Sequence, residues 1–148
     1  MTANRVNIRL AVISDVGSLI EVDSIAQRDS HRRAFIENAT AAAQCWIATE
    51  RDYVPTTAGY GVLTKHFFER NFVPLIVVVE TARRRGVAVA ILRELEAQCR
   101  GTKLFTPTNT SNAAMRPLLL RCGFVESGYI ENLDEGDPEL IFVKLATI

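Results

Sequence analysis

The stretch VVVETARRRGVAVAIL, residues 77–92, decides the fold of this 148-residue chain. It opens inside the apolar run LIVVV of residues 75–79, which is typical of a strand covered on both faces. It ends as an amphipathic helix whose apolar residues recur on one stripe. Between the strand and the helix stand Arg83, Arg84, Arg85 and Gly86.

This junction has the properties of a phosphate site. The first backbone amides of a helix are unpaired, and the helix dipole adds partial positive charge at that end. Gly86 lets a phosphate approach the backbone, and the three arginines add full charges beside it. The glycine spacing fits neither a Walker loop nor a dinucleotide-binding fingerprint. A pyrophosphate is the predicted ligand, and an ordinary basic turn before a helix is the alternative.

The remaining periodicity predicts an α+β domain spanning residues 1–148. Its mixed, mostly antiparallel central sheet has about six to seven strands and is flanked by about four helices. Pro117 moves the expected start of the last helix to Met115 or Arg116, and Gly123 is its C-cap glycine. Strands are expected at residues 6–11, 45–49, 58–67, 72–79, 103–106, 124–133 and 140–145, and helices at 14–25, 30–43, 86–99 and 112–122. The turns at 69–71 and 134–138 predict two hairpins.

Composition narrows the function classes. Lys plus Arg equals Asp plus Glu, at 17 each, so the chain as a whole has no attraction for nucleic acid or an anionic membrane. The sequence contains no transmembrane run, and residues 1–9 contain no apolar signal-peptide core. Three cysteines without ligand spacing and two isolated histidines predict reduced thiols and no metal site. We therefore expect a cytoplasmic protein.

Three segments in register resemble the GNAT superfamily of N-acetyltransferases. RRRGVA at residues 83–88 resembles that family's Gln/Arg-x-x-Gly-x-Gly/Ala loop, and LIVVV resembles the strand that pairs with pantetheine. Asn112 followed by Gly123 and Phe124 resembles its Asn…Gly-Phe segment. The resemblance implies an acyltransferase that uses acetyl-CoA as co-substrate and no metal. An acceptor primary amine would attack the thioester directly.

The resemblance also implies roles for particular residues. The backbones of Ile76, Val77 and Val78 would bind the pantetheine amides, and Asn112 would bond the cofactor near its pantetheine end. The strand holding Ile76 would splay from the one holding Leu104 and Phe105. The pyrophosphate loop would comprise Arg83, Arg84, Arg85, Gly86, Val87, Ala88 and Val89, with the amides from Arg84 to Val89 as its cradle.

The family's usual acid and base positions are filled by Pro74, Pro107 and Leu119, which cannot transfer protons. An oriented thioester, a backbone amide at the oxyanion and an ordered water could replace them. The catalytic residues are therefore left unassigned. Among other titratable residues Glu69, His66 and Glu21 are the candidates, and a surface role is the favoured interpretation for each.

The sequence does not identify the acceptor amine. A small-molecule amine is the leading interpretation, and a protein N-terminus or a lysine is the second. A third is a non-catalytic CoA-binding sensor, which the empty acid and base positions favour. Nothing in the sequence fixes the oligomeric state, and a homodimer is one open possibility. A group of carboxylates in the last hairpin would attract a polyamine, although a solvated turn is the favoured interpretation: Glu131, Asp134, Glu135, Asp137 and Glu139.

Overall fold

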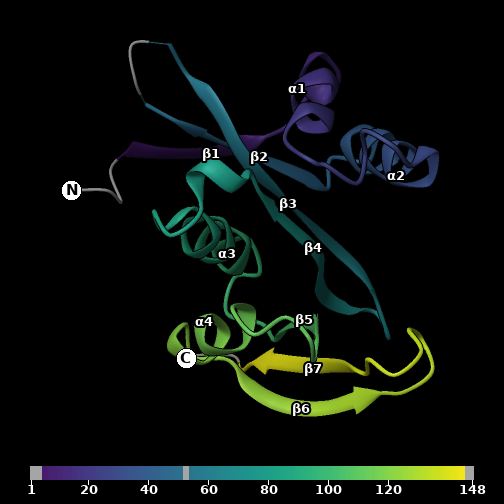
Figure 1. Cartoon of the computed structure of the whole chain (residues 1–148). Coiled ribbons are helices and arrows are strands. Elements are labelled where there is room, and N and C mark those ends of the chain that lie inside the picture. The colour runs from purple at the N-terminus through teal and green to yellow at the C-terminus, as the bar shows by residue number, and fades with distance from the viewer. Residues whose placement is uncertain (1–4, 52–53, 146–148) are drawn as a thin grey trace. The chain divides into compact units, whose positions relative to one another are not determined.

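The computed structural model describes residues 5–51 and 54–145 (Figure 1). Seven strands pair in the order β1-β2-β3-β4-β5-β7-β6, and four α-helices accompany them, which confirms the predicted α+β fold class. The strands are β1 Val6–Leu10, β2 Cys45–Glu50, β3 Thr56–Phe67, β4 Arg70–Val78, β5 Leu104–Asn109, β6 Val125–Ile130 and β7 Glu139–Lys144. The helices are α1 Val16–Glu21, α2 Ser30–Ala41, α3 Val87–Gln98 and α4 Met115–Arg121, with short 3-10 helices η2 Ile13–Asp15 and η3 Glu80–Ala82.

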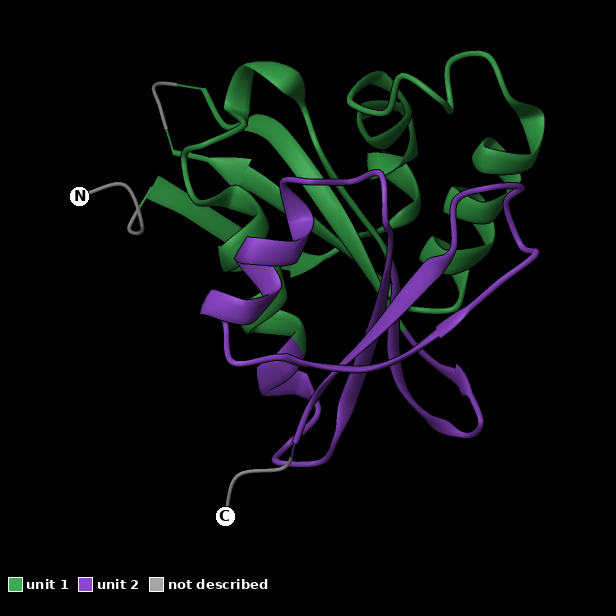
Figure 2. Ribbon diagram, turned by 60° about the horizontal axis from the view of Figure 1, so that its bottom comes forward, with its two compact units in different colours: residues 1–63, 75–95 green, residues 64–74, 96–148 purple. Residues whose placement is uncertain are grey.

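The chain divides into two compact units (Figure 2). Unit 1 comprises residues 1–63 and 75–95, and unit 2 comprises residues 64–74 and 96–148. The division falls inside β3, β4 and α3, so each of these elements contributes to both units.

Unit 1 has its core on one face of the antiparallel strands β1, β2 and β3. Leu19 of α1 and Ile36 of α2 pack there against Ile47 and Tyr60, and each of these four side chains is at most 1% exposed. Burying large side chains of this kind stabilises the unit by roughly 1.5–3 kcal/mol each. This core fixes both helices against the sheet.

The other face of β3 carries α3. Gly61 is required there, because a Cβ at this position would lie 2.5 Å from Ile91 Cγ2 and 3.0 Å from Leu95 Cδ1. Ile91 and Leu95 are fully buried and belong to the apolar stripe expected from the sequence. The glycine therefore lets α3 approach the sheet closely.

Unit 2 is built on β5, β7 and β6, which pair antiparallel, while β4 begins parallel to β5 at Asn71–Leu104 and Phe72–Phe105. Helix α4 starts at Met115, as Pro117 predicts, because a proline is tolerated in a first turn. It ends in a Schellman motif at Gly123 (φ 91°), where Phe124 N–H donates to Leu119 O at 3.0 Å. The predicted C-cap glycine is confirmed.

Several predicted boundaries are wrong. The first helix ends at Glu21 instead of continuing to residue 25, and the second ends at Ala41 instead of residue 43. Asp29 caps the second helix, since its carboxylate accepts from His31 N–H at 2.8 Å. The turn between β3 and β4 is shorter than predicted. It consists of Phe68 and Glu69, with φ 51° and 63°. Paired positive φ values match the twist of a two-residue hairpin turn.

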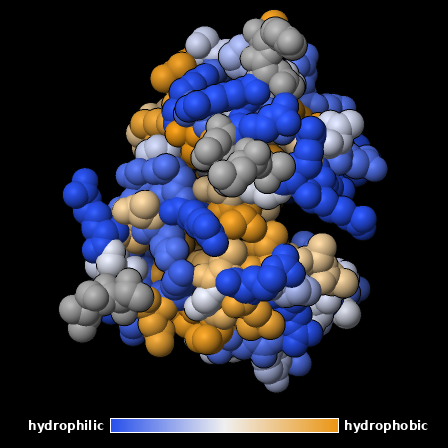
Figure 3. Space-filling model, turned by 90° about the vertical axis from the view of Figure 1, so that its left-hand side faces the viewer, coloured by the Kyte–Doolittle hydropathy of each residue, from blue (hydrophilic) through white to orange (hydrophobic). Residues whose placement is uncertain are grey.

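Apolar groups also reach the surface, and Figure 3 shows one face on which they lie between hydrophilic residues. In β6 every residue is exposed, including Val125 (49%) and Tyr129 (63%). Among the described residues no helix is long and apolar enough to cross a membrane.

Candidate cofactor site

The segment between β4 and α3 forms an open, positively charged loop in unit 1. It runs from η3 through Arg83 to Gly86, and α3 begins at Val87. Arg84 (φ 68°) and Gly86 (φ 81°) are both left-handed, a conformation that costs an arginine about 1 kcal/mol. A Cβ at Gly86 would meet nothing within 4 Å, so the space above this glycine is open.

The amides that follow this turn have no acceptor in the described part of the chain. The first backbone hydrogen bond that closes onto the new helix is Ala90 N–H to Gly86 O at 3.0 Å. The N–H groups from Arg84 to Val89 therefore make no hydrogen bond with the described residues. Unpaired amides at the N-terminus of a 12-residue helix form a donor-rich surface that suits an anion.

The three arginines have different partners. Arg83 Nε donates to Val78 O at 3.3 Å, which ties the loop to the end of β4. Arg85 donates to Thr81 O at 2.9 Å and forms an ion pair with Glu50 at 3.1 Å. Arg84 has no ion pair or side-chain hydrogen bond among the described residues and is exposed. Its guanidinium is therefore the one most available to a ligand.

The end of β4 passes close to Gly59 of β3. The side chain of Val77 packs against the core of unit 1, whereas its carbonyl oxygen would lie 2.2 Å from a Cβ at Gly59. Val79 N–H donates to Ala58 O at 2.8 Å directly after this point. No side chain fits beside the Val77 carbonyl, so Gly59 is required for this path of Ile76, Val77 and Val78.

Asn112 belongs to unit 2 and lies just before α4. Its Oδ1 accepts from Met115 N–H at 3.3 Å, so the side chain binds the start of the helix. Its amide nitrogen has no partner among the described residues and can still donate.

The residues at the family's usual acid and base positions lie within regular elements. Leu119 is fully buried in α4, and Pro107 of β5 pairs with Ile141 of β7. Pro74 lies within β4, where a proline has no N–H to donate to the sheet ladder.

The three weaker catalytic candidates lie on different elements. Glu21 is the last residue of α1 in unit 1, while His66 of β3 and Glu69 of the following turn lie in unit 2. All three are exposed, and none has a hydrogen bond or ion pair that fixes its side chain among the described residues. Glu69 precedes β4, whereas Ile76 and Val78 lie at the other end of that strand.

Sequence reasoning missed a buried charged group in unit 1. Asp23 is 2% exposed, and its carboxylate accepts from the Tyr60 hydroxyl and from Arg32 at 2.9 Å. Burial alone would raise the pKa of Asp23, but these hydrogen bonds outweigh burial and lower it. Burial and the neighbouring carboxylate raise the pKa of Tyr60, so its hydroxyl stays protonated. Asp23 had stood within a predicted helix, which gave no sign of burial.

The acidic turn holds unit 2 together locally. Asp137 accepts from the Thr110 hydroxyl at 2.9 Å and the Ser111 hydroxyl at 2.6 Å, and these partners lower its pKa. Asp134 accepts from Asn109 Nδ2 at 2.9 Å. Two of the five carboxylates suggested for a polyamine therefore already bind the last residue of β5 and the two residues that follow it.

The three cysteine thiols differ in how deeply they are buried. Cys45 is fully buried and Cys99 is 6% exposed, and burial raises the pKa of each to about 11. Cys122 is half-buried. Among the described residues no group of three or more His, Cys, Asp or Glu side chains is arranged to hold a metal ion.

Three similar solved structures are acetyltransferases. A GNAT-family acetyltransferase from Bacillus cereus is 34% identical, with a TM-score of 0.86, and the match covers 97% of this chain and 99% of that one. The ribosomal-protein-S18-alanine N-acetyltransferase of Escherichia coli is 18% identical over 97% of this chain and 95% of its own, with a TM-score of 0.74. The second likeness shows the fold alone. Among curated proteins none matches the sequence.

A third structure contains a ligand. It is assigned as a streptothricin acetyltransferase from Bacillus anthracis in complex with acetyl coenzyme A. It is 19% identical over 70% of this chain and 62% of its own, with a TM-score of 0.61. At this identity, the similarity to this structure also shows only a common fold.

The fold and the loop before α3 thus define an N-acetyltransferase. The sequence itself matches the Acetyltransferase (GNAT) family over residues 16–124. This chain belongs to the GNAT family of acetyltransferases.

Proposed function

We propose that this protein transfers an acetyl group from acetyl-CoA to a primary amine of a small molecule. The observation that carries the proposal is the run of unpaired amides from Arg84 to Val89, beside an open Gly86 and the exposed Arg84. A pyrophosphate supplies the acceptors that these donors lack, and helix dipole and guanidinium charge stabilise the bound anion.

The same loop adjoins the strand that would bind the pantetheine arm. Arg83 ties the loop to Val78, so the proposed phosphate contacts and strand contacts share one rigid segment of unit 1. The backbone groups of Ile76, Val77 and Val78 would bind the pantetheine amides, and Asn112 Nδ2 would donate to the same arm. The Val77 carbonyl lies so close to Gly59 that a Cβ there would be 2.2 Å from its oxygen.

Catalysis would depend on the positioning of the reacting groups. When bound, the cofactor supplies a reactive thioester. The chain would orient that thioester and exclude water, which lowers a barrier by roughly 7–11 kcal/mol in well-oriented reactions. A backbone amide of β4 would stabilise the oxyanion. No described side chain among Glu21, His66 and Glu69 is fixed as a base, so the amine would lose its proton to water.

The cofactor part is tested by thermal unfolding with CoA. A ligand at about 100 times its Kd stabilises a protein by about 2.7 kcal/mol, which raises Tm by roughly 5–10 °C at this size. Gly86→Asp adds a negative charge to the cradle and should abolish the shift. Gly86→Ala is the matched control, since it shares the backbone cost of positive φ without the charge and should keep most of the shift. A full shift in a folded Gly86→Asp protein would sink the assignment.

The transfer itself is tested by release of the CoA thiol from acetyl-CoA over a panel of amines. We expect turnover with one class of small primary amines and slower turnover with peptides. Turnover only with a peptide N-terminus or lysine would favour a protein acceptor. CoA binding without turnover would favour a sensor. The assignment of residues 1–148 to one acetyltransferase domain, and a cytoplasmic location, are part of the same proposal.

A further inference from the structure

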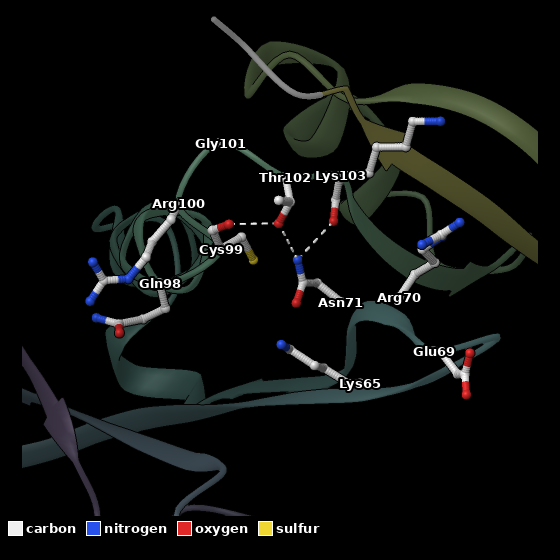
Figure 4. A pocket seen from close by; sticks show the side chains of 10 residues that line it. All are labelled: Lys65, Glu69, Arg70, Asn71, Gln98, Cys99, Arg100, Gly101, Thr102 and Lys103. Carbon is white, nitrogen blue, oxygen red and sulfur yellow. Dashed lines mark hydrogen bonds between the residues drawn. The ribbon is translucent and has the colours of Figure 1, made fainter.

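A cavity of about 710 Å³ lies in unit 2, at the C-terminal end of α3 (Figure 4). Its walls come from the end of β3, the turn into β4 and the turn between α3 and β5. Cavities of about 300–1,000 Å³ are the size that holds small organic ligands. None of its residues belongs to the proposed cofactor loop.

The lining is strongly cationic. Lys65, Arg70, Arg100 and Lys103 line the cavity, and Glu69 is its only carboxylate. None of the four cations forms an ion pair with the described residues, although five other ion pairs occur there. Figure 4 shows Glu69 directed away from the centre. In a chain of zero net charge, this excess of unpaired cations is a local feature.

These cations are not needed to satisfy the end of the helix. Glu96 O accepts from Cys99 N–H, and Ala97 O accepts from Arg100 N–H. Cys99 O accepts from the Thr102 hydroxyl at 2.6 Å. Burial keeps the Cys99 thiol protonated, with a pKa of about 11, so the thiol adds no negative charge. Among the described residues, four cations and one carboxylate therefore line the cavity, and none of the four cations forms an ion pair there.

The floor of the cavity is held in place by Asn71. Its Nδ2 donates to Thr102 Oγ1 at 2.6 Å and to Lys103 O at 3.0 Å, which links β4 to the turn before β5. In Figure 4 the four cationic residues lie on different sides of the Asn71 side chain. The cavity thus has a polar centre with cationic residues around it.

We propose that this cavity binds a small organic anion carrying more than one phosphate group. The phosphates would lie among these cations, since guanidinium groups bind phosphate oxygens bidentately and lysine adds a mobile point charge. A cavity of about 710 Å³ has the size of a small-molecule site. The site is independent of the acetyl-CoA proposal, because the two rest on different segments.

Inorganic pyrophosphate is the probe, with binding to the full chain measured by calorimetry in low salt. The paired variant Lys65→Gln/Arg100→Gln should weaken binding at the cavity by about tenfold or more, because two charge-assisted contacts are lost. Arg70→Gln/Lys103→Gln should act in the same direction. Arg93→Gln is the matched control, since Arg93 is exposed on α3 and lies outside the cavity, and it should change Kd by less than about twofold.

The cofactor loop could also bind pyrophosphate, and amide NMR separates the two sites. Binding in the cavity shifts the signals of Gly101, Thr102 and the Asn71 side chain, whereas binding at the loop shifts Gly86 and is weakened by Arg84→Gln. Shifts confined to Gly86, or a Kd unchanged by both cavity variants in folded proteins, would overturn the proposal. So would binding of a single-stranded oligonucleotide at the cavity without any binding of pyrophosphate there.

Discussion

At the scale of single residues, Asp23 shows how a charge can organise a segment that has no regular structure. Its carboxylate binds Tyr60 and Arg32 and also accepts from the amides of Ile25 and Ala26, at 3.0 and 3.2 Å. These bonds stabilise the turns that follow α1. The carboxylate therefore accepts hydrogen bonds from amides that would bond to backbone carbonyls in a longer helix.

We predict that Asp23→Asn lowers the free energy of unfolding at pH 7 by about 2–4 kcal/mol, since an amide cannot satisfy the same donors. The native pKa of Asp23 lies below its ordinary value, so its contribution is present above about pH 4. It is lost as the pH falls through the native pKa. Urea unfolding of both proteins between pH 7 and pH 3 should show that the difference in their free energies of unfolding decreases. A difference in unfolding free energy that is independent of pH would contradict a role for the Asp23 charge.

At the scale of elements, β3 is the strand whose sequence is most constrained by its neighbours. Gly59 leaves room for the Val77 carbonyl of β4, and Gly61 leaves room for Ile91 of α3. Only a shift of backbone could accommodate a side chain at Gly59. At Gly61 the nearest atoms belong instead to the buried side chains of Ile91 and Leu95.

We predict that Gly59→Ala lowers the free energy of unfolding by about 2–4 kcal/mol and weakens CoA binding, because β4 must move. Gly17→Ala is the control. Gly17 lies in α1 with nothing within 4 Å of its Cβ position, so alanine there should stabilise by about 0.5–1 kcal/mol. Denaturant titrations, with and without CoA, measure both effects. A Gly59→Ala protein of normal stability would refute the close approach.

The elements with strong periodicity were predictable from the sequence, and those set by tertiary contacts were not. The LIVVV strand, the stripe of α3 and the delayed start of α4 at Met115 follow from apolar spacing and proline chemistry. The hairpin turn was predicted at residues 69–71 but consists of Phe68 and Glu69, a shift that the sequence did not indicate because neither residue is typical of positive φ. Within the candidate site, the loop glycine and arginines were predictable. The carbonyl over Gly59 was not, since a lone glycine in a strand has several meanings.

At the scale of the whole molecule, the two units share three secondary-structure elements. The boundary between the units cuts β3, β4 and α3, so each unit ends within strands and a helix that continue into the other. Partial unfolding of one unit would interrupt backbone hydrogen bonding in an element of both.

We therefore predict one thermal unfolding transition, with equal calorimetric and van't Hoff enthalpies. Calorimetry and circular dichroism should give the same midpoint. Adding CoA should raise that single midpoint as a whole. Two resolved transitions, of which CoA moves only one, would show that the units unfold separately.

The burial of two thiols has a practical consequence at the bench. With Cys45 and Cys99 inside the fold, Cys122 is the one cysteine positioned to react with a maleimide dye in the native protein. The natural sequence thus offers a single attachment point for a fluorophore beside the end of α4, without engineering. The same feature suits colorimetric thiol assays. Ellman's reagent should count about one protein thiol per native chain and all three after denaturation, so the background against released CoA is small and constant.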